Sequence, residues 1–227
     1  MDLYSFIIGN KESIKLIYAL IIIFICALIV TRSDRLFRLS EHNGIRYFRN
    51  AFLFYGLGFA FRYFLDYPLI KLGLYSQLWF LTEIFFEFFL VMGGFFLLYS
   101  LIWTRLESID EKSSLLSGKI AIFYAMSIVI ILMDFLWPGF NFMFLVQTTL
   151  FFVLSALSYS NYRKNGSRRK FPKFYFIAML LGLFAWILNT LASFFFSWNQ
   201  AVMINVYAFN LIFFLLFLYG VIRVTKT

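Results

Sequence analysis

Cysteine and histidine are almost missing from this sequence, and each scarcity excludes a class of protein. The 227 residues include one cysteine, Cys26, so the chain cannot form a disulfide bond with itself. Cys26 lies inside an apolar run, where a lone thiol does not identify a redox compartment. The one histidine, His42, rules out a metal centre built from several histidines. We therefore expect no metal site and no cofactor.

Apolar residues are present in excess. The chain is 63% hydrophobic and 23% aromatic, and its mean hydropathy is +0.85. Soluble domains are about 45–50% apolar. A soluble core of this chain length cannot hide so much apolar surface, so the lipid bilayer must solvate the folded chain.

Long apolar segments recur along the whole sequence. A helix needs about 20 mostly apolar residues to cross the hydrocarbon core, and we predict one all-α domain with seven membrane-spanning helices. Two connections, Pro138-Gly139 and Trp198-Asn199, are short enough to predict antiparallel neighbours. The start Met1-Asp2-Leu3-Tyr4 lacks the basic residues of a signal peptide, so we expect the first span to be retained. The predicted spans are 14–31, 47–67, 76–103, 119–137, 140–160, 174–197 and 200–223.

Basic residues predict the orientation of these spans. Of the 20 Lys and Arg residues, all but four fall in alternate connections and in the C-terminal tail: Arg32, Arg35, Arg38, Arg46, Arg49, Arg105, Lys112, Lys119, Arg163, Lys164, Arg168, Arg169, Lys170, Lys173, Arg223 and Lys226. Cytoplasmic loops of membrane proteins are enriched in Lys and Arg. The bias predicts an N-terminus outside and a C-terminus inside, in the cell membrane.

The basic connections have two interpretations. Residues 33–39 mix apolar with basic side chains, and Gly44 is expected to break this segment before the second span. An interfacial helix on anionic lipid or on a cytoplasmic protein is one interpretation, and a topology-determining loop is the other. The run 163–170 lacks interleaved aromatic residues, so we expect no nucleic-acid binding.

The third span carries two acids, Glu83 and Glu87, which lie four residues apart and therefore on one face of a helix. Carboxylates inside a membrane are costly and need partners. In the same span, Gly93-Gly94 is expected to thin or bend the helix. Ala178 and Gly182 are small residues four apart, which permit close helix approach.

Polar side chains collect in one half of the predicted bundle. At about 1.5 Å per helical residue, Arg62 lies about 7 Å below the outer edge, Glu83 about 10 Å and Glu87 about 16 Å. The same rise per residue places Asp134 about 5 Å deep, and it places the amides of Gln147, Asn189 and Asn210 about 10–15 Å deep. We predict a polar cavity that opens outward and is closed below by aromatic residues. Its candidate ligand- or ion-binding residues are Glu87, Glu83, Arg62, Asn189, Asn210, Gln147 and Asp134.

Charge pairing ranks these candidates. Arg62 and Glu83 have similar depths on sequential helices, so we predict an ion pair between them. Glu87 lies deeper, and burial favours the neutral form of a carboxyl group. We expect it to be neutral or bonded to Asn210 or Asn189. The alternative is that the polar groups only join helices.

The seven-helix topology, with its N-terminus outside, resembles the broad opsin and G-protein-coupled-receptor architecture, although topology does not fix function. The seventh span has no lysine for a retinal Schiff base and no proline, and one histidine is too few for a ceramidase-like zinc hydrolase. The stretch His42-Asn-Gly-Ile-Arg-Tyr-Phe-Arg-Asn-Ala-Phe-Leu-Phe-Tyr-Gly56 also resembles a segment of uncharacterised archaeal multi-pass proteins, and this resemblance implies no activity.

Three functions stay open at this point. The first is a receptor-like sensor, or a module that binds a small ligand or ion from outside and acts with a separate cytoplasmic partner. The second is a transporter or proton pathway that uses Glu83 and Glu87, against which the other half of the bundle offers no polar exit. The third is a structural membrane protein. An enzyme requires Glu87 and Asp134 to converge, and we assign no catalytic residue.

Overall fold

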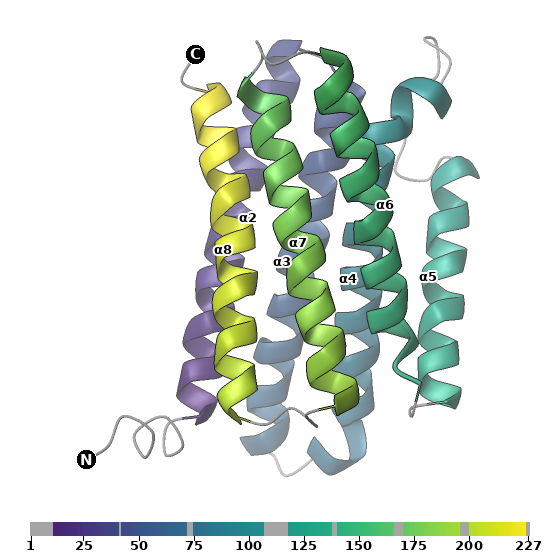
Figure 1. Cartoon of the computed structure of the whole chain (residues 1–227). Helices are drawn as coiled ribbons and strands as arrows, with labels where there is room; N and C mark the ends of the chain where they lie inside the picture. The colour runs from purple at the N-terminus through teal and green to yellow at the C-terminus, as the bar shows by residue number, and fades with distance from the viewer. Residues whose placement is uncertain are drawn as a thin grey trace.

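The computed structural model describes residues 11–40, 42–71, 75–106, 118–137, 140–165, 170–195 and 200–225. These residues form seven α-helices that alternate in direction along one axis (Figure 1). The fold is all-α, as predicted. The helices are α2 (Lys11–Ser40), α3 (Asn43–Lys71), α4 (Tyr75–Leu106), α5 (Gly118–Leu136), α6 (Phe142–Asn165), α7 (Lys170–Phe195) and α8 (Gln200–Thr225).

The lengths of the helices suit a bilayer. α2 has 30 residues and α4 has 32, which corresponds to about 45–48 Å at 1.5 Å per residue. Among the described residues, five helices are long and apolar enough to cross a membrane: α2, α4, α6, α7 and α8. α5 contains a shorter apolar segment, Ile120–Leu136. The chain is therefore a multi-pass integral membrane protein, and five of the seven predicted spans meet this criterion of length and hydropathy.

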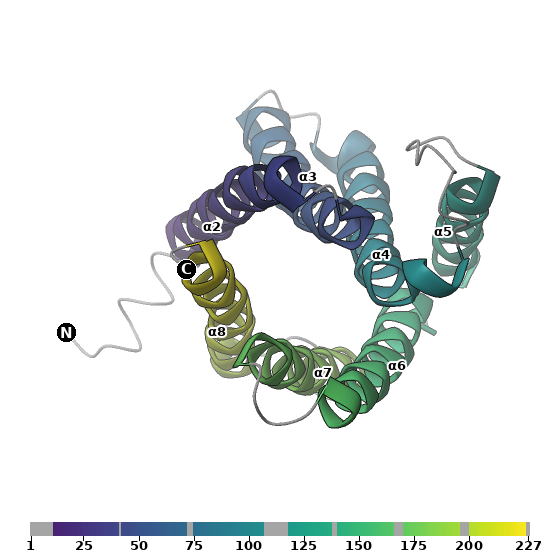
Figure 2. The same cartoon turned by 90° about the horizontal axis from the view of Figure 1, so that it is seen from above.

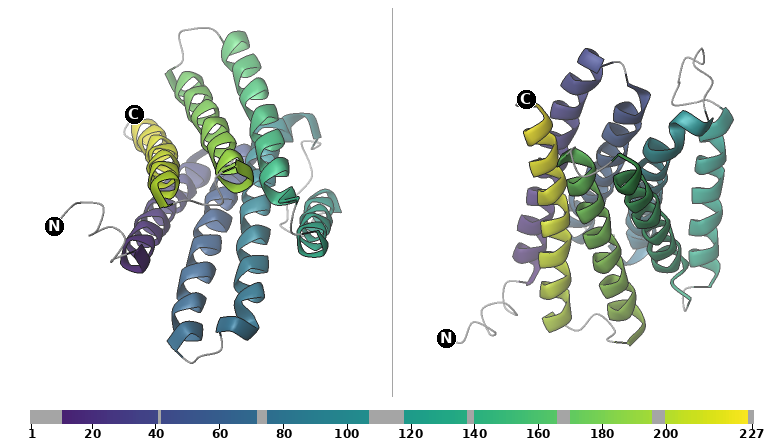
Figure 3. Two further views of the ribbon diagram at one scale, coloured as in Figure 1. Left: turned by 60° about the horizontal axis from the view of Figure 1, so that its bottom comes forward. Right: turned by 45° about the horizontal axis from the view of Figure 1, so that its top comes forward.

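Six helices form a closed ring. α2 packs on α3, α3 on α4, α4 on α6, α6 on α7, and α7 on α8, and α8 returns to α2. Figure 2 shows this ring from above, with α5 outside it. α5 packs on α4 and α6, and both views of Figure 3 place it away from α2 and α8. The sequence did not predict that one helix would be peripheral.

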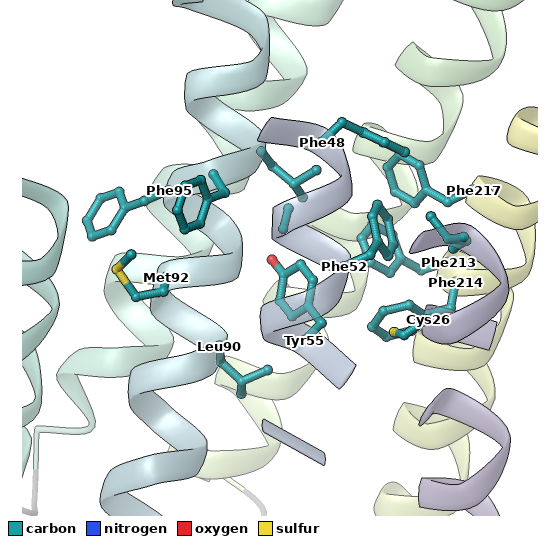
Figure 4. Packing of buried hydrophobic residues seen from close by; sticks show 14 of the residues in the cluster. Cys26, Phe48, Phe52, Tyr55, Leu90, Met92, Phe95, Phe213, Phe214 and Phe217 are labelled. Atoms are coloured by element: carbon teal, nitrogen blue, oxygen red, sulfur yellow. The ribbon is translucent and has the colours of Figure 1, made fainter. Parts of the chain in front are cut away.

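Aromatic side chains fill the interior of the ring. The ring centroids of Phe52 and Phe217 are 5.0 Å apart, and those of Phe213 and Phe217 are 4.9 Å apart. Figure 4 shows this cluster between α3 and α8. Lipid tails are as apolar as these rings, so close packing rather than escape from water holds the helices together. Each well-oriented aromatic pair adds about 0.5–1.5 kcal/mol.

Glycine allows α7 to approach its neighbours closely. A Cβ atom at Gly182 would lie 2.6 Å from the rings of Phe151 on α6 and Phe213 on α8. Ala178, one turn earlier, is also buried. The predicted close approach at Ala178 and Gly182 is therefore confirmed.

The hairpin between α2 and α3 corrects one sequence prediction. Residues 33–39 do not form a separate interfacial helix, because α2 continues without interruption to Ser40. Gly44 does not break the segment either, since it lies in the first turn of α3. A Cβ atom there would lie 2.5 Å from the indole nitrogen of Trp103. Gly44 is needed for the close approach of α3 to the end of α4.

Charged side chains reinforce the same hairpin. The Asp34 carboxylate accepts a hydrogen bond of 2.9 Å from Nε of Arg38, and it also forms an ion pair with Arg49 of α3. The Arg49 guanidinium lies 5.8 Å from the ring centroid of Phe37. We call this end of the bundle, where α2, α4, α6 and α8 end, the basic end, and we call the opposite end the N-terminal end.

Candidate functional site

The seven candidate residues lie in the half of the bundle next to the N-terminal end. α3, α5 and α7 run toward that end and α4, α6 and α8 run away from it. Arg62, Asp134 and Asn189 are therefore late in their helices, while Glu83, Glu87, Gln147 and Asn210 are in the first half of theirs. The alternation of the helices produces this shared level. The cavity predicted at this level stays a prediction.

Glu87 lies at the centre of a group of charges. The charges of Asp134, Glu83 and Arg62 all act on its carboxyl group. Within the described part of the chain, the Glu87 carboxylate makes no hydrogen bond and no ion pair. The expected bond from Glu87 to Asn210 or Asn189 is therefore not made in the structure. We call Glu83, Glu87, Asp134 and Arg62 the acidic cluster.

Arg62 is engaged by an aromatic ring. Its guanidinium carbon lies 4.4 Å from the centroid of Phe86 on α4, within the range of a cation–π contact. α3 and α4 pack directly against each other, as the adjacency of the second and third spans predicted. The ion pair between Arg62 and Glu83 stays a prediction.

Asp134 has a structural role that the sequence did not reveal. Its carboxylate accepts hydrogen bonds from the backbone N–H groups of Phe142 (2.7 Å) and Met143 (3.1 Å). The first N–H groups of a helix have no partner inside the helix, so Asp134 of α5 caps α6. The cap stands eight residues before the helix, and the usual pattern has a capping residue directly before it. Asn141, directly before α6, has a positive φ of 45°.

The two asparagines form a second group. Nδ2 of Asn189 donates to Oδ1 of Asn210 at 3.3 Å and to the backbone carbonyl of Ala185 at 2.8 Å. The Tyr18 hydroxyl faces Asn210 without reaching hydrogen-bond geometry. The Tyr18 ring stacks on Tyr207 at 4.4 Å. This group joins α7, α8 and α2 and closes the ring of helices, and Tyr18 is a member that sequence reasoning missed.

Gln147 stands apart from both groups. Its side chain is 0% exposed and lies between α6 and α4. Neither its amide nitrogen nor its amide oxygen has a hydrogen-bond partner among the described residues. The adjacent Thr148 points elsewhere, because its hydroxyl contacts that of Thr190 on α7 at 2.8 Å.

The structure thus distributes the candidates around the ring of helices. The acidic cluster joins α3, α4 and α5, the asparagines join α7 and α8, and Gln147 lies between α4 and α6. The described residues include no group of three or more His, Cys, Asp or Glu side chains arranged to hold a metal ion.

Fold and site together define a multi-pass helical membrane protein whose seven candidate polar residues lie in the half of the bundle next to the N-terminal end. Comparison with family models, with curated proteins and with solved structures gives no match. The opsin-like and archaeal resemblances therefore have no family evidence behind them.

Proposed function

We propose that all seven helices cross the cell membrane with the N-terminus outside, and that the protein is a receptor-like sensor of a small cationic ligand or ion. In this proposal the ligand enters from the N-terminal end and binds at Glu87. The basic end, which carries Arg35, Arg38 and Arg163, then faces the cytoplasm and contacts a separate partner protein.

The Glu87 carboxylate, which has no bonded partner among the described residues, carries the proposal. Its neighbours are already engaged, because both Asp134 oxygens bond the backbone of α6 and Arg62 lies over Phe86. A carboxyl group inside a membrane protein that has no bonded partner is a functional candidate by default.

The balance of charge supports a cation as the ligand. The acidic cluster contains three acids and one base, so it is negative when all four groups are ionised. A divalent metal ion needs several converging ligands, and the described residues do not offer them. A monovalent cation, such as an ammonium group, needs one carboxylate and an aromatic or polar surround.

Thermal unfolding of the full chain in detergent tests this proposal, with ethylammonium chloride as the probe and sodium chloride at the same ionic strength as the control. A ligand at 100 times its Kd stabilises the folded state by about 2.7 kcal/mol. We expect ethylammonium to raise the Tm of the wild type by several degrees and to have little effect on Glu87→Gln. A matched variant, Tyr159→Phe, removes an exposed hydroxyl from the other half of α6 and should respond as the wild type does.

Equal shifts for Glu87→Gln and the wild type would remove Glu87 from the site. If ethylammonium does not raise the Tm of the wild type above its value in the sodium chloride control, the proposal of an ammonium-type ligand is wrong.

A transport function is the second candidate, and one observation favours it. The hydroxyls of Ser100 on α4 and Tyr175 on α7 lie 3.4 Å apart in the half next to the basic end, and Ser155 donates to the carbonyl of Met179 in the same half. These contacts place hydrogen-bonded hydroxyl groups in the half of the bundle that a transport path would have to cross. Proton or cation flux into liposomes that depends on Glu87 would favour transport over sensing.

The purely structural alternative rests on the remaining contacts. The Asp134 cap, the Thr148–Thr190 contact and the Asn189–Asn210 bond each join two helices and need no ligand. This alternative predicts that Glu87→Gln changes neither probe binding nor flux.

A further inference from the structure

Two adjacent glycines on α4 receive polar side chains from two different helices. A Cβ atom at Gly93 would lie 3.0 Å from ring carbons Cε1 and Cζ of Tyr55 on α3. A Cβ atom at Gly94 would lie 2.9 Å from Oε1 of Gln147 on α6. The glycine pair was expected to thin or bend the helix, and its side of α4 instead accommodates these two groups.

Both polar groups are deeply buried and unbonded. Tyr55 is 2% exposed and Gln147 is 0% exposed. Among the described residues, the Tyr55 hydroxyl and both polar atoms of the Gln147 amide have no hydrogen-bond partner. More than nine in ten buried polar groups in proteins are hydrogen-bonded to protein or to ordered water, so three such atoms beside one helical turn require an explanation.

The surroundings determine what can satisfy these atoms. Figure 4 shows the hydroxyl end of Tyr55 directed from α3 toward α4, while Phe52 and Phe214 fill the side toward α8. The Tyr55 ring centroid lies 6.1 Å from that of Phe52 and 5.8 Å from that of Phe214. None of these groups carries a formal charge, which disfavours an ion. A buried water needs two to four polar partners; the Tyr55 hydroxyl offers one polar atom on the α3 side of α4, and the Gln147 amide offers two on the α6 side.

We propose that the Gly93-Gly94 turn of α4 marks an internal hydration site, where water molecules bond the Tyr55 hydroxyl and the Gln147 amide. The site stands on its own geometry and does not depend on a ligand at Glu87. It lies in the middle of the bundle, where the sequence predicted a closed aromatic floor.

The position of the site along α4 gives it a consequence. Phe86, Gly93 and Ser100 are seven residues apart, so they share one face of α4 at intervals of about 10 Å. Arg62 lies over Phe86, Tyr55 packs on Gly93, and Tyr175 contacts Ser100. Hydration at Gly93 would put a polar site on α4 halfway between the acidic cluster and the Ser100–Tyr175 hydroxyl pair near the basic end.

Radiolytic hydroxyl-radical labelling tests the proposal, because bound water generates the radical beside the residue that it touches. The full chain is irradiated in a lipid nanodisc, and oxidation of each tyrosine is measured by mass spectrometry. Tyr47 is the matched control: it lies on the same helix, is 1% exposed and packs its ring against Tyr99 at 4.4 Å. We expect Tyr55 to be oxidised several-fold faster than Tyr47.

Two outcomes overturn the proposal. The first is oxidation of Tyr55 no faster than that of Tyr47 in the wild type, a comparison that needs no variant. The second comes from Gln147→Met, which replaces the amide by an apolar chain of similar length. If the Gln147 amide of the wild type is dry and unbonded, its replacement by methionine should raise the stability of the protein. If the amide is hydrated, the replacement should lower the stability and slow the oxidation of Tyr55. A higher Tm for Gln147→Met therefore refutes hydration.

Discussion

The cap that Asp134 provides for α6 makes a quantitative prediction. Asp134→Ala removes the acceptor of two backbone hydrogen bonds, of 2.7 and 3.1 Å. A hydrogen bond to a charged group contributes about 1.5–3 kcal/mol, and substitution of a helix cap costs about 0.5–2 kcal/mol. Asp134 is half-buried, so water replaces part of the loss. We expect Asp134→Ala to lower the free energy of unfolding by about 2–4 kcal/mol.

The assay is reversible unfolding in mixed micelles with increasing sodium dodecyl sulfate, followed by far-ultraviolet circular dichroism. Asp134→Asn keeps one acceptor oxygen and loses the charge, so its loss should be about half that of Asp134→Ala. Ser127→Ala is the control on the same helix. The Ser127 hydroxyl is fully buried and has no partner among the described residues, so its removal should leave stability unchanged or slightly higher.

If Asp134→Ala proves as stable as Ser127→Ala, the two backbone hydrogen bonds contribute nothing to stability and the proposed cap is refuted. A loss in stability with an unchanged response to ethylammonium would assign Asp134 to the fold rather than to ligand binding.

Two further predictions concern packing and charge. Gly182→Ala should destabilise the protein by about 1–3 kcal/mol, because the added Cβ atom meets the rings of Phe151 and Phe213. Gly220→Ala is the control, since no described residue lies within 4 Å of its Cβ position. Equal unfolding curves for the two variants would contradict the expected clash at Gly182. Arg62→Ala should destabilise, and the double variant Arg62→Ala/Glu83→Gln should cost less than the sum of the single changes. Strict additivity in that cycle would argue against the predicted pair.

The level of the polar residues could be predicted from the sequence because it depends on helix length and direction alone. The same calculation could not show which polar residues meet. Asp134 and Glu87 lie near each other because α5 packs outside the ring against α4, and no periodicity in α5 encodes that position. Asn189 and Asn210 bond to each other instead of to Glu87, because α7 and α8 are neighbours in the ring.

The sequence also could not identify the side chains that pack against the buried glycines. Gly93-Gly94 is a visible feature, but its neighbours Tyr55 and Gln147 are distant along the chain. The role of Gly44 was predicted wrongly for a similar reason. Its neighbour Trp103 reaches it only after α3 and α4 have packed, so the local rule that glycine ends a helix did not apply.

By itself, the sequence determined that this chain is an all-α membrane protein and that its seven candidate residues lie at one level of the bundle. Composition and helical rise are sufficient for both conclusions, because they are properties of single segments. The tertiary structure decided that six helices close a ring, that α5 lies outside it, and that no described residue bonds the Glu87 carboxylate. Those results depend on which helices touch. Helix contacts are set by the packing of side chains that are far apart in the sequence, and the hydrophobic pattern of a single segment does not reveal them.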